Sequence, residues 1–508
     1  MSEAMIHSGQ RSRLQTEVKL RAAKLASGLS ALGVGHGDKY VIVLRNEIAF
    51  IEATLAAGII GAVPVPVNWH WTGDDLHHLL HDSGAKLAFV HSDLLENVEL
   101  HMPEGMAIVE VEVPEEIRDA YHLGGVPLTG RHQTLEELVA ASDPILEPNT
   151  NPPLSLIYTS GTTGLAKGII RDPVAPERAP DLMSAVATLF KLNPAWSTLL
   201  PAPIYHSAPN TAAIFATAVG MPVYIMPKFD PEEFLRMVQD HKINTVQMVP
   251  TMFTRLLQLP REVRESYDVS SLKAIIHAAA PCPWELKLAM IEWFGPIVDE
   301  FYGGSEGGMW VHCTSEEAMA HPGTVGRPFL DADIRILGPD NLPVPTGEQG
   351  IIYGKNFSAW PDFTYVGNEQ KRRDIEVDGY ITVGDVGYLD EDGFLHLTDR
   401  LNDMVISGGV NIYPAEIEAR ISTLEGVADV AVFGIPDVDF GESLAAHVQL
   451  LPGAVLSAGD IKAHVVAGLA KYKVPRTVVF EETLPREDTG KMFKRRLKAP
   501  YWETATKV

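Results

Sequence analysis

The sequence contains few cysteines and no long apolar run. Cys282 and Cys313 are the only cysteines among 508 residues, too few for the disulfide framework of a secreted protein and typical of a reducing compartment. No uninterrupted apolar stretch is long enough to span a bilayer, and the Met1 end lacks the basic-then-apolar pattern of a secretory signal. We therefore expect a cytoplasmic protein without integral membrane association.

The sequence also contains fewer basic residues than acidic residues. The chain carries 41 Lys and Arg against 66 Asp and Glu, a formal net charge of -25 at pH 7. A surface of this sign repels nucleic acid and anionic membrane, so we expect neither as the main partner. An anionic ligand would need local basic residues that act against the overall field. The length itself predicts two or more domains.

Short strands and helices alternate over much of the chain. This alternation predicts the α/β class with a parallel, doubly wound sheet. Residues 92–150 are polar and irregular, and residues 323–397 read as short strands with Gly, Pro and Asp turns, typical of a small β-rich subdomain. The chain beyond Arg400 reads as a separate α+β unit. The predicted strands of the alternating parts cover 40–44, 63–67, 86–90, 223–226, 245–249, 272–276 and 297–301.

The segment from Tyr158 to Gly168 combines glycines, hydroxyl side chains and one lysine, in the order YTSGTTGLAKG. Glycines let successive backbone N–H groups turn toward one point, and the hydroxyl groups and the lysine add donors and a positive charge. Such a loop suits a polyphosphate, although it is not the Walker loop, in which Gly-Lys-Ser/Thr is contiguous. The expected phosphate-binding residues are Thr159, Ser160, Gly161, Thr162, Thr163, Gly164 and Lys167.

The whole string closely resembles the phosphate-binding signature of the adenylate-forming superfamily: acyl-CoA synthetases, aryl-acid ligases, peptide-synthetase adenylation domains and firefly-type luciferases. The resemblance implies a large N-terminal domain over 1–400, made of two doubly wound αβα subdomains and a small β-barrel-like subdomain. It also implies a hinge at 401–402 and a small mobile α+β domain over 403–508. ATP, Mg²⁺ and coenzyme A are the implied ligands.

Two further segments resemble the nucleotide site of that superfamily. Tyr302 to Glu306 (YGGSE) is similar to the Tyr-Gly-x-Thr-Glu motif, which implies that Tyr302 stacks on adenine and Glu306 binds Mg²⁺. His277 to Pro283 (HAAAPCP) is similar to a Gly-Gly-Ala-Pro segment, with alanines in place of the two glycines. The residues expected at the nucleotide are Ala279, Ala280, Pro281, Phe301, Tyr302, Gly303 and Ser305.

Residues 203–206 (PIYH) resemble an element of acyl-CoA synthetases in which the histidine, here His206, lies beside the carboxylate and the approaching thiol. Residues 203–210 contain no Asp or Glu. This absence favours an acid without an α-amine, because a buried ammonium without a counter-charge is costly. The expected walls of the acid pocket are Ser207, Thr211, His277, Ala278 and Gly304.

The C-terminal third carries the remaining resemblances. Residues 379–387 (GYITVGDVG) resemble a Thr-Gly-Asp motif, so that Asp385 would accept both ribose hydroxyl groups, and Arg400 resembles an arginine that also contacts ribose. Residues 401–414 (LNDMVISGGVNIYP) and 484–497 (LPREDTGKMFKRRL) resemble the hinge region and the catalytic-lysine segment. The implied residues are Asn402 at the hinge, Gly408 and Gly409 along the pantetheine tunnel, and Lys491 as the catalytic lysine.

We therefore expect an AMP-forming acyl-CoA ligase in which His206, Glu306 and Lys491 take part in catalysis. Residues 68–72 (NWHWT) resemble a run in actinobacterial acyl-CoA ligases and favour a bulky acid, of alicyclic, steroid or terpenoid type, over acetate. A ligase that loads a carrier protein and a luciferase-like oxygenase remain alternatives, and a homodimer is left open. A catalytically degenerate nucleotide-binding regulatory protein is a further alternative, against which the retained Glu306, Asp385, Arg400 and Lys491 argue.

Overall fold

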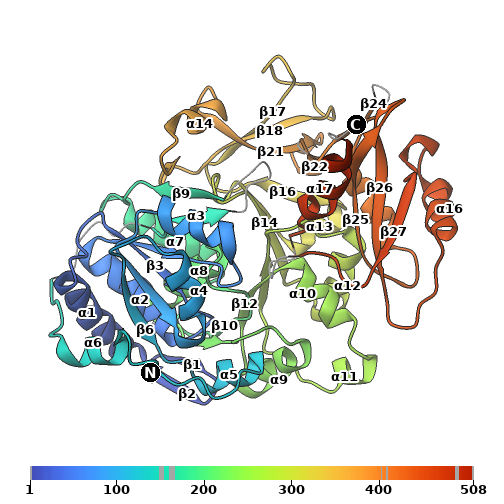
Figure 1. Ribbon diagram of the computed structural model, residues 1–508. Coiled ribbons are helices and arrows are strands. Elements are labelled where there is room, and N and C mark those ends of the chain that lie inside the picture. The colour runs from blue at the N-terminus through green and yellow to red at the C-terminus, as the bar shows by residue number, and fades with distance from the viewer. Residues whose placement is uncertain are drawn as a thin grey trace.

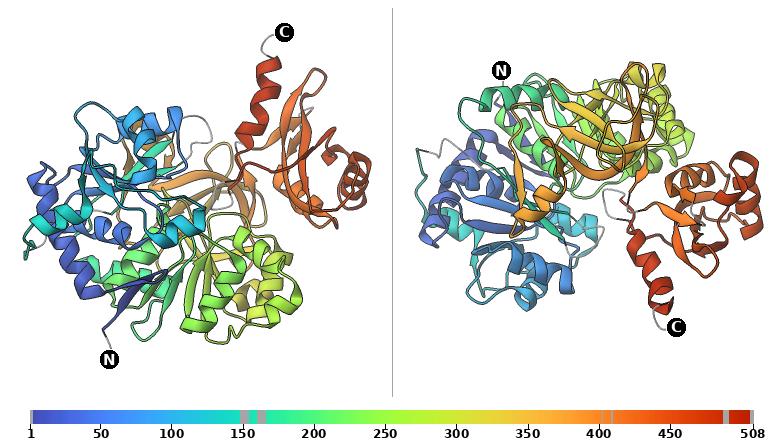
Figure 2. Two further views of the ribbon diagram at one scale, coloured as in Figure 1. Left: turned by 60° about the horizontal axis from the view of Figure 1, so that its bottom comes forward. Right: turned by 90° about the horizontal axis from the view of Figure 1, so that it is seen from above.

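The computed structural model describes residues 3–147, 154–159, 166–401, 403–407, 410–486 and 491–505. They form a large N-terminal part and a smaller C-terminal unit that stands beside it as a separate lobe (Figure 1 and Figure 2). The α/β class with a large N-terminal and a small C-terminal domain is confirmed. Within the described ranges, no helix combines the length and the apolar character needed to cross a bilayer.

The first unit of the N-terminal part is a five-stranded parallel sheet. Every residue of two of its strands is buried, as expected where helices cover both faces of a parallel sheet. Its strands, in spatial order, are β4 (Val63–Pro66), β3 (Lys39–Val43), β5 (Leu87–His91), β6 (Ala107–Val111) and β7 (Gln133–Thr134). Its helices are α1 (Gln15–Ala31), α2 (Ile48–Ile60), α3 (Gly73–Asp82), α4 (Leu95–His101), α5 (Glu115–Tyr121) and α6 (Leu135–Ala141).

The second unit has a parallel sheet at its centre. In spatial order its strands are β14 (Val298–Tyr302), β13 (Ala274–His277), β12 (Thr245–Met248), β10 (Thr198–Leu200) and β11 (Val223–Ile225). Its helices are α7 (Ala179–Leu189), α8 (Ser207–Ala218), α9 (Pro231–His241), α10 (Pro250–Leu257), α11 (Arg261–Glu265) and α12 (Trp284–Phe294). The two units contact each other where α2 packs against α8, and both helices line a cavity of the candidate site.

The β-rich region continues the second sheet. Strand β15 pairs antiparallel with β14, and β16 then joins β15 to β22. The region contains β15 (Val311–Cys313), α13 (Ser315–Ala320), β16 (Thr324–Pro328), β17 (Asp333–Leu337), β18 (Gly350–Lys355), α14 (Glu369–Asp374), β20 (Glu376–Val377), β21 (Tyr380–Leu389) and β22 (Leu395–Arg400). A separate three-stranded sheet consists of β19 (Phe363–Tyr365), β9 (Lys167–Arg171) and β8 (Ile157–Thr159).

The C-terminal unit is an α+β structure around a five-stranded sheet. Long antiparallel strands β25 and β26 form its centre, and β27 pairs parallel with β26. Its elements are β23 (Val405–Ser407), β24 (Val410–Ile412), α15 (Pro414–Ser422), β25 (Val427–Asp437), β26 (Gly441–Leu450), α16 (Ala458–Gly468), β27 (Thr477–Glu481) and α17 (Lys494–Ala505). The expected hinge residue, Asn402, lies outside the described residues, and the domain boundary at 401–402 stays a prediction.

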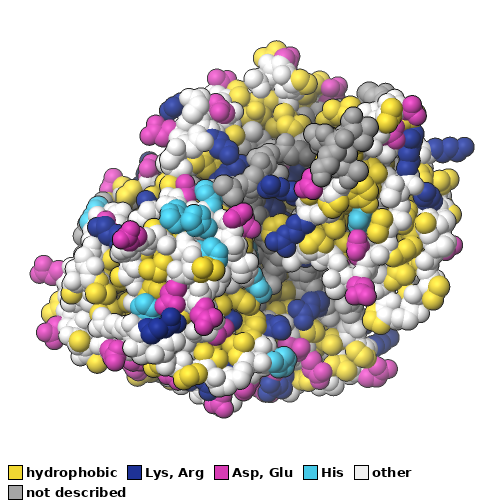
Figure 3. All heavy atoms as spheres, viewed as in Figure 1, with side chains coloured by type: hydrophobic (Ala, Val, Ile, Leu, Met, Phe, Trp, Pro, Cys, Tyr) yellow, Lys and Arg dark blue, Asp and Glu magenta, His cyan; other side chains and the backbone are white. Residues whose placement is uncertain are grey.

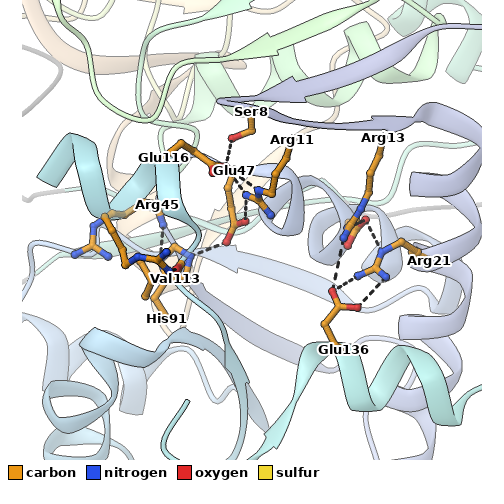
Figure 4. Close-up of polar contacts among 12 residues, drawn as sticks. Ser8, Arg11, Arg13, Arg21, Arg45, Glu47, His91, Val113, Glu116 and Glu136 are labelled. Atoms are coloured by element: carbon orange, nitrogen blue, oxygen red, sulfur yellow. Dashed lines mark hydrogen bonds and ion pairs between the residues drawn. The ribbon is translucent and has the colours of Figure 1, made fainter. Parts of the chain in front are cut away.

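A network of partly buried ion pairs holds the N-terminal hairpin, β1 (Met5–Ser8) and β2 (Arg11–Leu14), onto the first unit (Figure 4). Arg11 contacts Glu47 at 2.9 Å and Glu116 at 2.5 Å. Burial alone would raise the pKa of Glu47, but the hydrogen bonds with His91 and Arg11 outweigh it and lower that pKa. A second cluster consists of Arg13, Arg21, Glu52 and Glu136.

Two parts of the fold escaped prediction from the sequence. Residues 92–150 contain α4, α5 and α6, each of seven residues, which is too short for helical periodicity to emerge. Strand β1 pairs in parallel with β11, so that Ile6 lies opposite Val223. No local sequence pattern predicts that strands so far apart in the chain will pair.

Candidate active site

Two connected cavities lie where the three parts of the fold meet. The larger, of about 2540 Å³, extends between the N-terminal part and the C-terminal unit, and the smaller, of about 800 Å³, reaches inward between α2, α7 and α8. In Figure 3 Lys and Arg side chains gather around the hollow between the two lobes. Among the described residues, the negative overall charge is reversed in the lining of the smaller cavity, which has five Lys and Arg side chains and one Glu. The side chains that line both cavities include Trp71, Ala278, Ala279, Phe301, Arg400 and Lys491.

A buried polar corner lines the larger cavity. Strands β21 and β22 place Asp385 opposite Arg400, and the Asp385 carboxylate lies 3.2 Å from the Arg400 Nε. The Tyr302 hydroxyl group, at the end of β14, donates to Asp385 Oδ2 at 2.8 Å. Burial raises the pKa of Asp385, and Arg400 opposes that rise. The structure thus brings together the three residues that the sequence assigned to adenine and ribose.

The turn after β14 follows a tight backbone path. A Cβ atom at Gly303 would lie 1.9 Å from the carbonyl oxygen of Gly308, so only glycine fits there. Glu306 Oε1 accepts a hydrogen bond from the Tyr365 hydroxyl group at 3.1 Å. A single carboxylate suits Mg²⁺, which takes one or two carboxylates together with phosphate oxygens. The described residues hold no group of three His, Cys, Asp or Glu that could bind a metal by themselves.

Two lysines lie beside this carboxylate. Lys167 at the start of β9 and Lys371 on α14 have their ammonium groups 5.9 and 5.7 Å from the centre of the Tyr365 ring. Burial lowers the pKa of Lys167 to about 8, with the neighbouring ammonium group of Lys371 as the next cause. Lys371 and Tyr365 carried no recognisable motif in the sequence, and only the folding of β19 and α14 onto β9 brings them here.

The lowered pKa of Lys167 predicts a pH-dependent affinity for ATP. Above about pH 8 the free enzyme loses the proton on Lys167. If Lys167 binds the phosphates as the sequence predicts, KM for ATP rises when this positive charge is lost. Lys371→Gln removes the neighbouring charge, raises the pKa of Lys167 and moves this rise in KM to higher pH. KM for ATP measured between about pH 7 and about pH 9.5 checks this. Arg373→Gln, an exposed change on the same helix, is the control, and identical profiles for all three proteins would contradict the prediction.

Arg171, at the end of β9, is the main residue of this site that the sequence reading missed. Its Nη2 donates to the backbone carbonyl oxygens of Ser305 at 2.6 Å and Glu306 at 3.0 Å, and its Nη1 donates to that of Pro361 at 3.0 Å. Burial lowers the pKa of Arg171 to about 10, so it remains charged at neutral pH. In the sequence, the only feature that could have pointed to Arg171 is that a lone arginine follows the apolar pair Ile169-Ile170.

The smaller cavity contains most of the predicted wall of the acid pocket. Ser207, Thr211, Ala278 and Gly304 line it, and so does His206, at the start of α8. His277 does not line this cavity, and its predicted place in the wall of the acid pocket is corrected. Its side chain is fully buried, 5.1 Å from the Phe253 ring, and burial lowers its pKa to about 4. Successive side chains of a strand point to opposite faces, so when Ala278 lines the cavity His277 faces the core.

Ala279 has an unusual backbone conformation. Its φ of 77° lies in the left-handed region, which costs a non-glycine residue about 1–2 kcal/mol. Relief of this strain outweighs or offsets the loss of about 0.4–1 kcal/mol through the more flexible unfolded chain, so Ala279→Gly should raise the free energy of unfolding by up to about 1.5 kcal/mol. Ala280→Gly, whose position has no such strain, should lower it. Urea denaturation of both variants checks this, and equal destabilisation by the two changes would contradict it.

Lys491 lies at the junction of the two cavities. Its charge adds to the effect of burial in lowering the pKa of Lys167 and opposes the burial that raises the pKa of Asp385, so it is close to the polar corner and to the phosphate-loop lysine at once. Ala280 and Pro281 line the larger cavity, and Thr159 and Ser305 line the smaller one. The predicted residues that lie outside the described ranges are Ser160, Gly161, Thr162, Thr163, Gly164, Asn402, Gly408 and Gly409.

Comparisons with known proteins agree with this arrangement. The model of the AMP-binding enzyme family matches residues 3–358, and that of the AMP-binding enzyme C-terminal domain matches residues 416–491. A feruloyl-CoA synthase of Amycolatopsis sp is 33% identical over 94% of this chain and 92% of its own length. The long-chain-fatty-acid–CoA ligase FadD13 of Mycobacterium tuberculosis is 29% identical over 96% of this chain and 92% of its own.

Two further comparisons bear on the acid and on the fold. The 3-[(3aS,4S,7aS)-7a-methyl-1,5-dioxo-octahydro-1H-inden-4-yl]propanoyl:CoA ligase of Mycobacterium tuberculosis is 31% identical over 95% of this chain and 93% of its own. Among solved structures, ATP-bound MatB from Rhodopseudomonas palustris superposes with a TM-score of 0.83 at 26% identity, and covers 98% of this chain and 96% of its own.

Proposed function

This chain belongs to the AMP-binding enzyme family, as an AMP-forming acid–thiol ligase of the acyl-CoA synthetase type. On that premise we propose that its acid is a bulky alicyclic carboxylic acid of steroid or terpenoid type and that its acceptor is free coenzyme A. The main observation that supports this class of acid is the inner cavity, which has a volume of about 800 Å³. Part of this volume adjoins Lys167, Glu306 and Arg400, which would hold the nucleotide, and the part between α2, α7 and α8 remains for an acid larger than acetate.

The walls of this cavity support an apolar acid. They include Leu55 and Ile59 of α2, Leu182 of α7, and Ile214 and Phe215 of α8. Burying an apolar ring skeleton against such side chains stabilises the complex by about 25 cal/mol per Å² of area removed from water. The relative named for a methyl-dioxo-octahydroindenyl propanoyl substrate carries a fused-ring acid in its name, which further supports a ring system over a linear chain.

In the proposed reaction the carboxylate of the acid attacks the α-phosphorus of ATP, and pyrophosphate leaves with the β- and γ-phosphates. The thiolate of coenzyme A then attacks the acyl carbon, and AMP leaves with the former carboxylate oxygen. The first step crowds negative charge, so positioning and electrostatic stabilisation dominate its barrier. The excess of Lys and Arg over acidic residues in the described lining of the smaller cavity supports this assignment.

The roles of individual residues form part of the proposal. Lys491 would bridge the acid and the α-phosphate, and its place at the junction of the two cavities supports that role. Asp385 and Arg400 would hold the ribose, and Lys167 with the loop 160–165 would hold the outer phosphates. Glu306 would hold Mg²⁺, which supplies charge neutralisation when bound. For the second step, a rotation about Asn402 would withdraw Lys491 and present Gly408 and Gly409 to pantetheine.

Pyrophosphate release with a panel of acids tests the substrate class. The panel holds the hydrindane-dione propanoic acid of the relative's name, 5β-cholanic acid, ferulic acid, palmitic acid and acetic acid. We expect the two alicyclic acids to give the highest kcat/KM and acetate the lowest. Palmitic or acetic acid as the best substrate would overturn the proposed acid class. Product formation with coenzyme A and with a phosphopantetheinylated carrier protein distinguishes the two acceptors.

A further inference from the structure

The inner cavity is apolar over most of its wall, yet three of its side chains present polar atoms that have no hydrogen-bond partner. Among the residues that the structure describes, Asn210 Nδ2, Gln247 Oε1 and Trp360 Nε1 are buried and unpaired, and all three side chains line this cavity. Asn210 and Gln247 are only 6% and 4% exposed. Buried polar atoms in folded proteins are usually paired. Buried atoms without a hydrogen-bond partner also occur elsewhere in the described residues, for example at Arg264, but these three are on side chains that line one cavity, where a ligand can supply their partners.

The orientation of each amide is fixed by its other end. In the structure Asn210 Oδ1 accepts a hydrogen bond from the Ser155 hydroxyl group at 2.9 Å, and in this amide orientation Nδ2 is the atom without a partner. Gln247 Nε2 donates to the backbone carbonyl oxygen of Met248 at 2.9 Å, which leaves Oε1 as the free acceptor. These groups are therefore held in place before a ligand enters, and a ligand that pairs with them bears little cost for ordering them.

The position of Asn210 defines which part of the acid it would meet. It lies one turn of α8 beyond His206, since its backbone N–H donates to the His206 carbonyl oxygen at 2.9 Å. One helical turn rises about 5.4 Å, and α8 lines the cavity beyond His206, so Asn210 is displaced along the cavity from His206, beside which we expect the carboxylate. The partner of Asn210 Nδ2 thus belongs to the body of the acid and not to its reacting group.

We propose that the acid carries oxygen substituents on its apolar skeleton, and that a ketone or hydroxyl oxygen of the ring system accepts a hydrogen bond from Asn210 Nδ2. Trp360 Nε1 donates to a second such oxygen, and Gln247 Oε1 accepts from a hydroxyl substituent where one is present. The inference rests on the proposed function and specifies its substrate class as an oxygenated alicyclic acid. Asn210 is then the residue that selects oxygenated rings over plain hydrocarbon chains.

Selection follows from the cost of unpaired groups. An acid without the oxygen buries the Asn210 donor unpaired, which costs about 1–3 kcal/mol and corresponds to a factor of about 5 to 150 in kcat/KM. An acid with the oxygen avoids that cost. The wild-type enzyme should therefore prefer the oxygenated member of a matched pair of acids by about fivefold or more.

The test uses two matched pairs of acids: hydrindane propanoic acid with and without its two ketones, and 5β-cholanic acid with and without an oxo group at each of its ring positions 3, 7 and 12. kcat/KM from pyrophosphate release is measured for the wild type and for Asn210→Leu and Asn210→Ala. Both substitutions should bring the ratio between the oxo acid and its plain partner close to one. Thr217→Val on the same helix, whose hydroxyl group bonds to Ala213 inside α8, should keep the wild-type ratio.

Each outcome decides one claim. A wild-type enzyme that converts plain and oxo acids equally well, or an Asn210→Ala enzyme that keeps the full preference, overturns the role of Asn210 while the ligase activity stands. Conversion of palmitic acid in preference to every ring acid overturns both the oxygenated ring and the alicyclic class. Failure to form AMP with any acid overturns the proposed function itself. Asn210→Ala, which only removes atoms, covers the case in which Asn210→Leu does not fold.

Discussion

Lys491→Ala is expected to lower the rate of acyl-adenylate formation by about 10²- to 10³-fold, the usual effect of removing one preorganised charge from a reacting centre. Lys491 lines both cavities, and its positive charge acts on Lys167 and Asp385. The variant should still convert supplied acyl adenylate and coenzyme A to thioester at close to the wild-type rate, because the proposed second step does not use this amine. ATP–pyrophosphate exchange and single-turnover thioester formation measure the two steps separately.

Lys471→Ala provides the matched control for this change. Lys471 is an exposed lysine of the same C-terminal unit, and its removal should leave both steps within about twofold, as is usual for surface substitutions. An equal loss of both steps in the Lys491→Ala enzyme would contradict its assignment to the first step alone. Unchanged pyrophosphate exchange would remove Lys491 from the reaction altogether.

Arg171→Met is expected to damage both stability and the first step. The change leaves the carbonyl oxygens of Ser305, Glu306 and Pro361 without their donor, at about 1–3 kcal/mol for each buried group. The free energy of unfolding should fall by about 3–5 kcal/mol, as when a buried charged group loses its contacts. Because the turn that carries Glu306 loses its support, kcat for pyrophosphate exchange should fall by about tenfold or more, with a rise in KM for Mg-ATP.

A second variant at Arg171 separates the geometry of the hydrogen-bond donors from the charge, and a control variant changes another arginine. Arg171→Lys keeps the charge but loses most of the planar donor geometry, so its kcat should lie between those of the wild type and Arg171→Met. Arg178→Met removes an exposed arginine that also bonds a backbone carbonyl oxygen, that of Ser358, and should change stability by no more than about 0.5 kcal/mol. Normal kcat and KM in a destabilised Arg171→Met enzyme would show that Arg171 is structural only.

The motifs identified from the sequence lie in several distant parts of the chain, and the structure gathers their described members around one pair of cavities. Tyr302 follows a buried strand, Asp385 and Arg400 lie on paired strands, and Lys491 follows β27 in the other lobe. Local motifs of this kind are readable because glycines, hydroxyl groups and charged side chains seldom recur at such fixed spacings by chance. Residue-level roles on these motifs stay predictions until the variants above are measured.

The sequence by itself determined the α/β class, the order of most strands and helices, the change to short strands in the β-rich region, and the segments that carry the chemistry. These features depend on neighbouring residues, through hydrophobic periodicity and turn-forming residues. Only the tertiary structure revealed that Arg171 supports the Glu306 turn, that Lys371 lowers the pKa of Lys167, that His277 faces the core, and that Asn210, Gln247 and Trp360 meet in one cavity. Those relations join residues separated by many elements, and contacts over such distances leave no periodic trace in a single sequence.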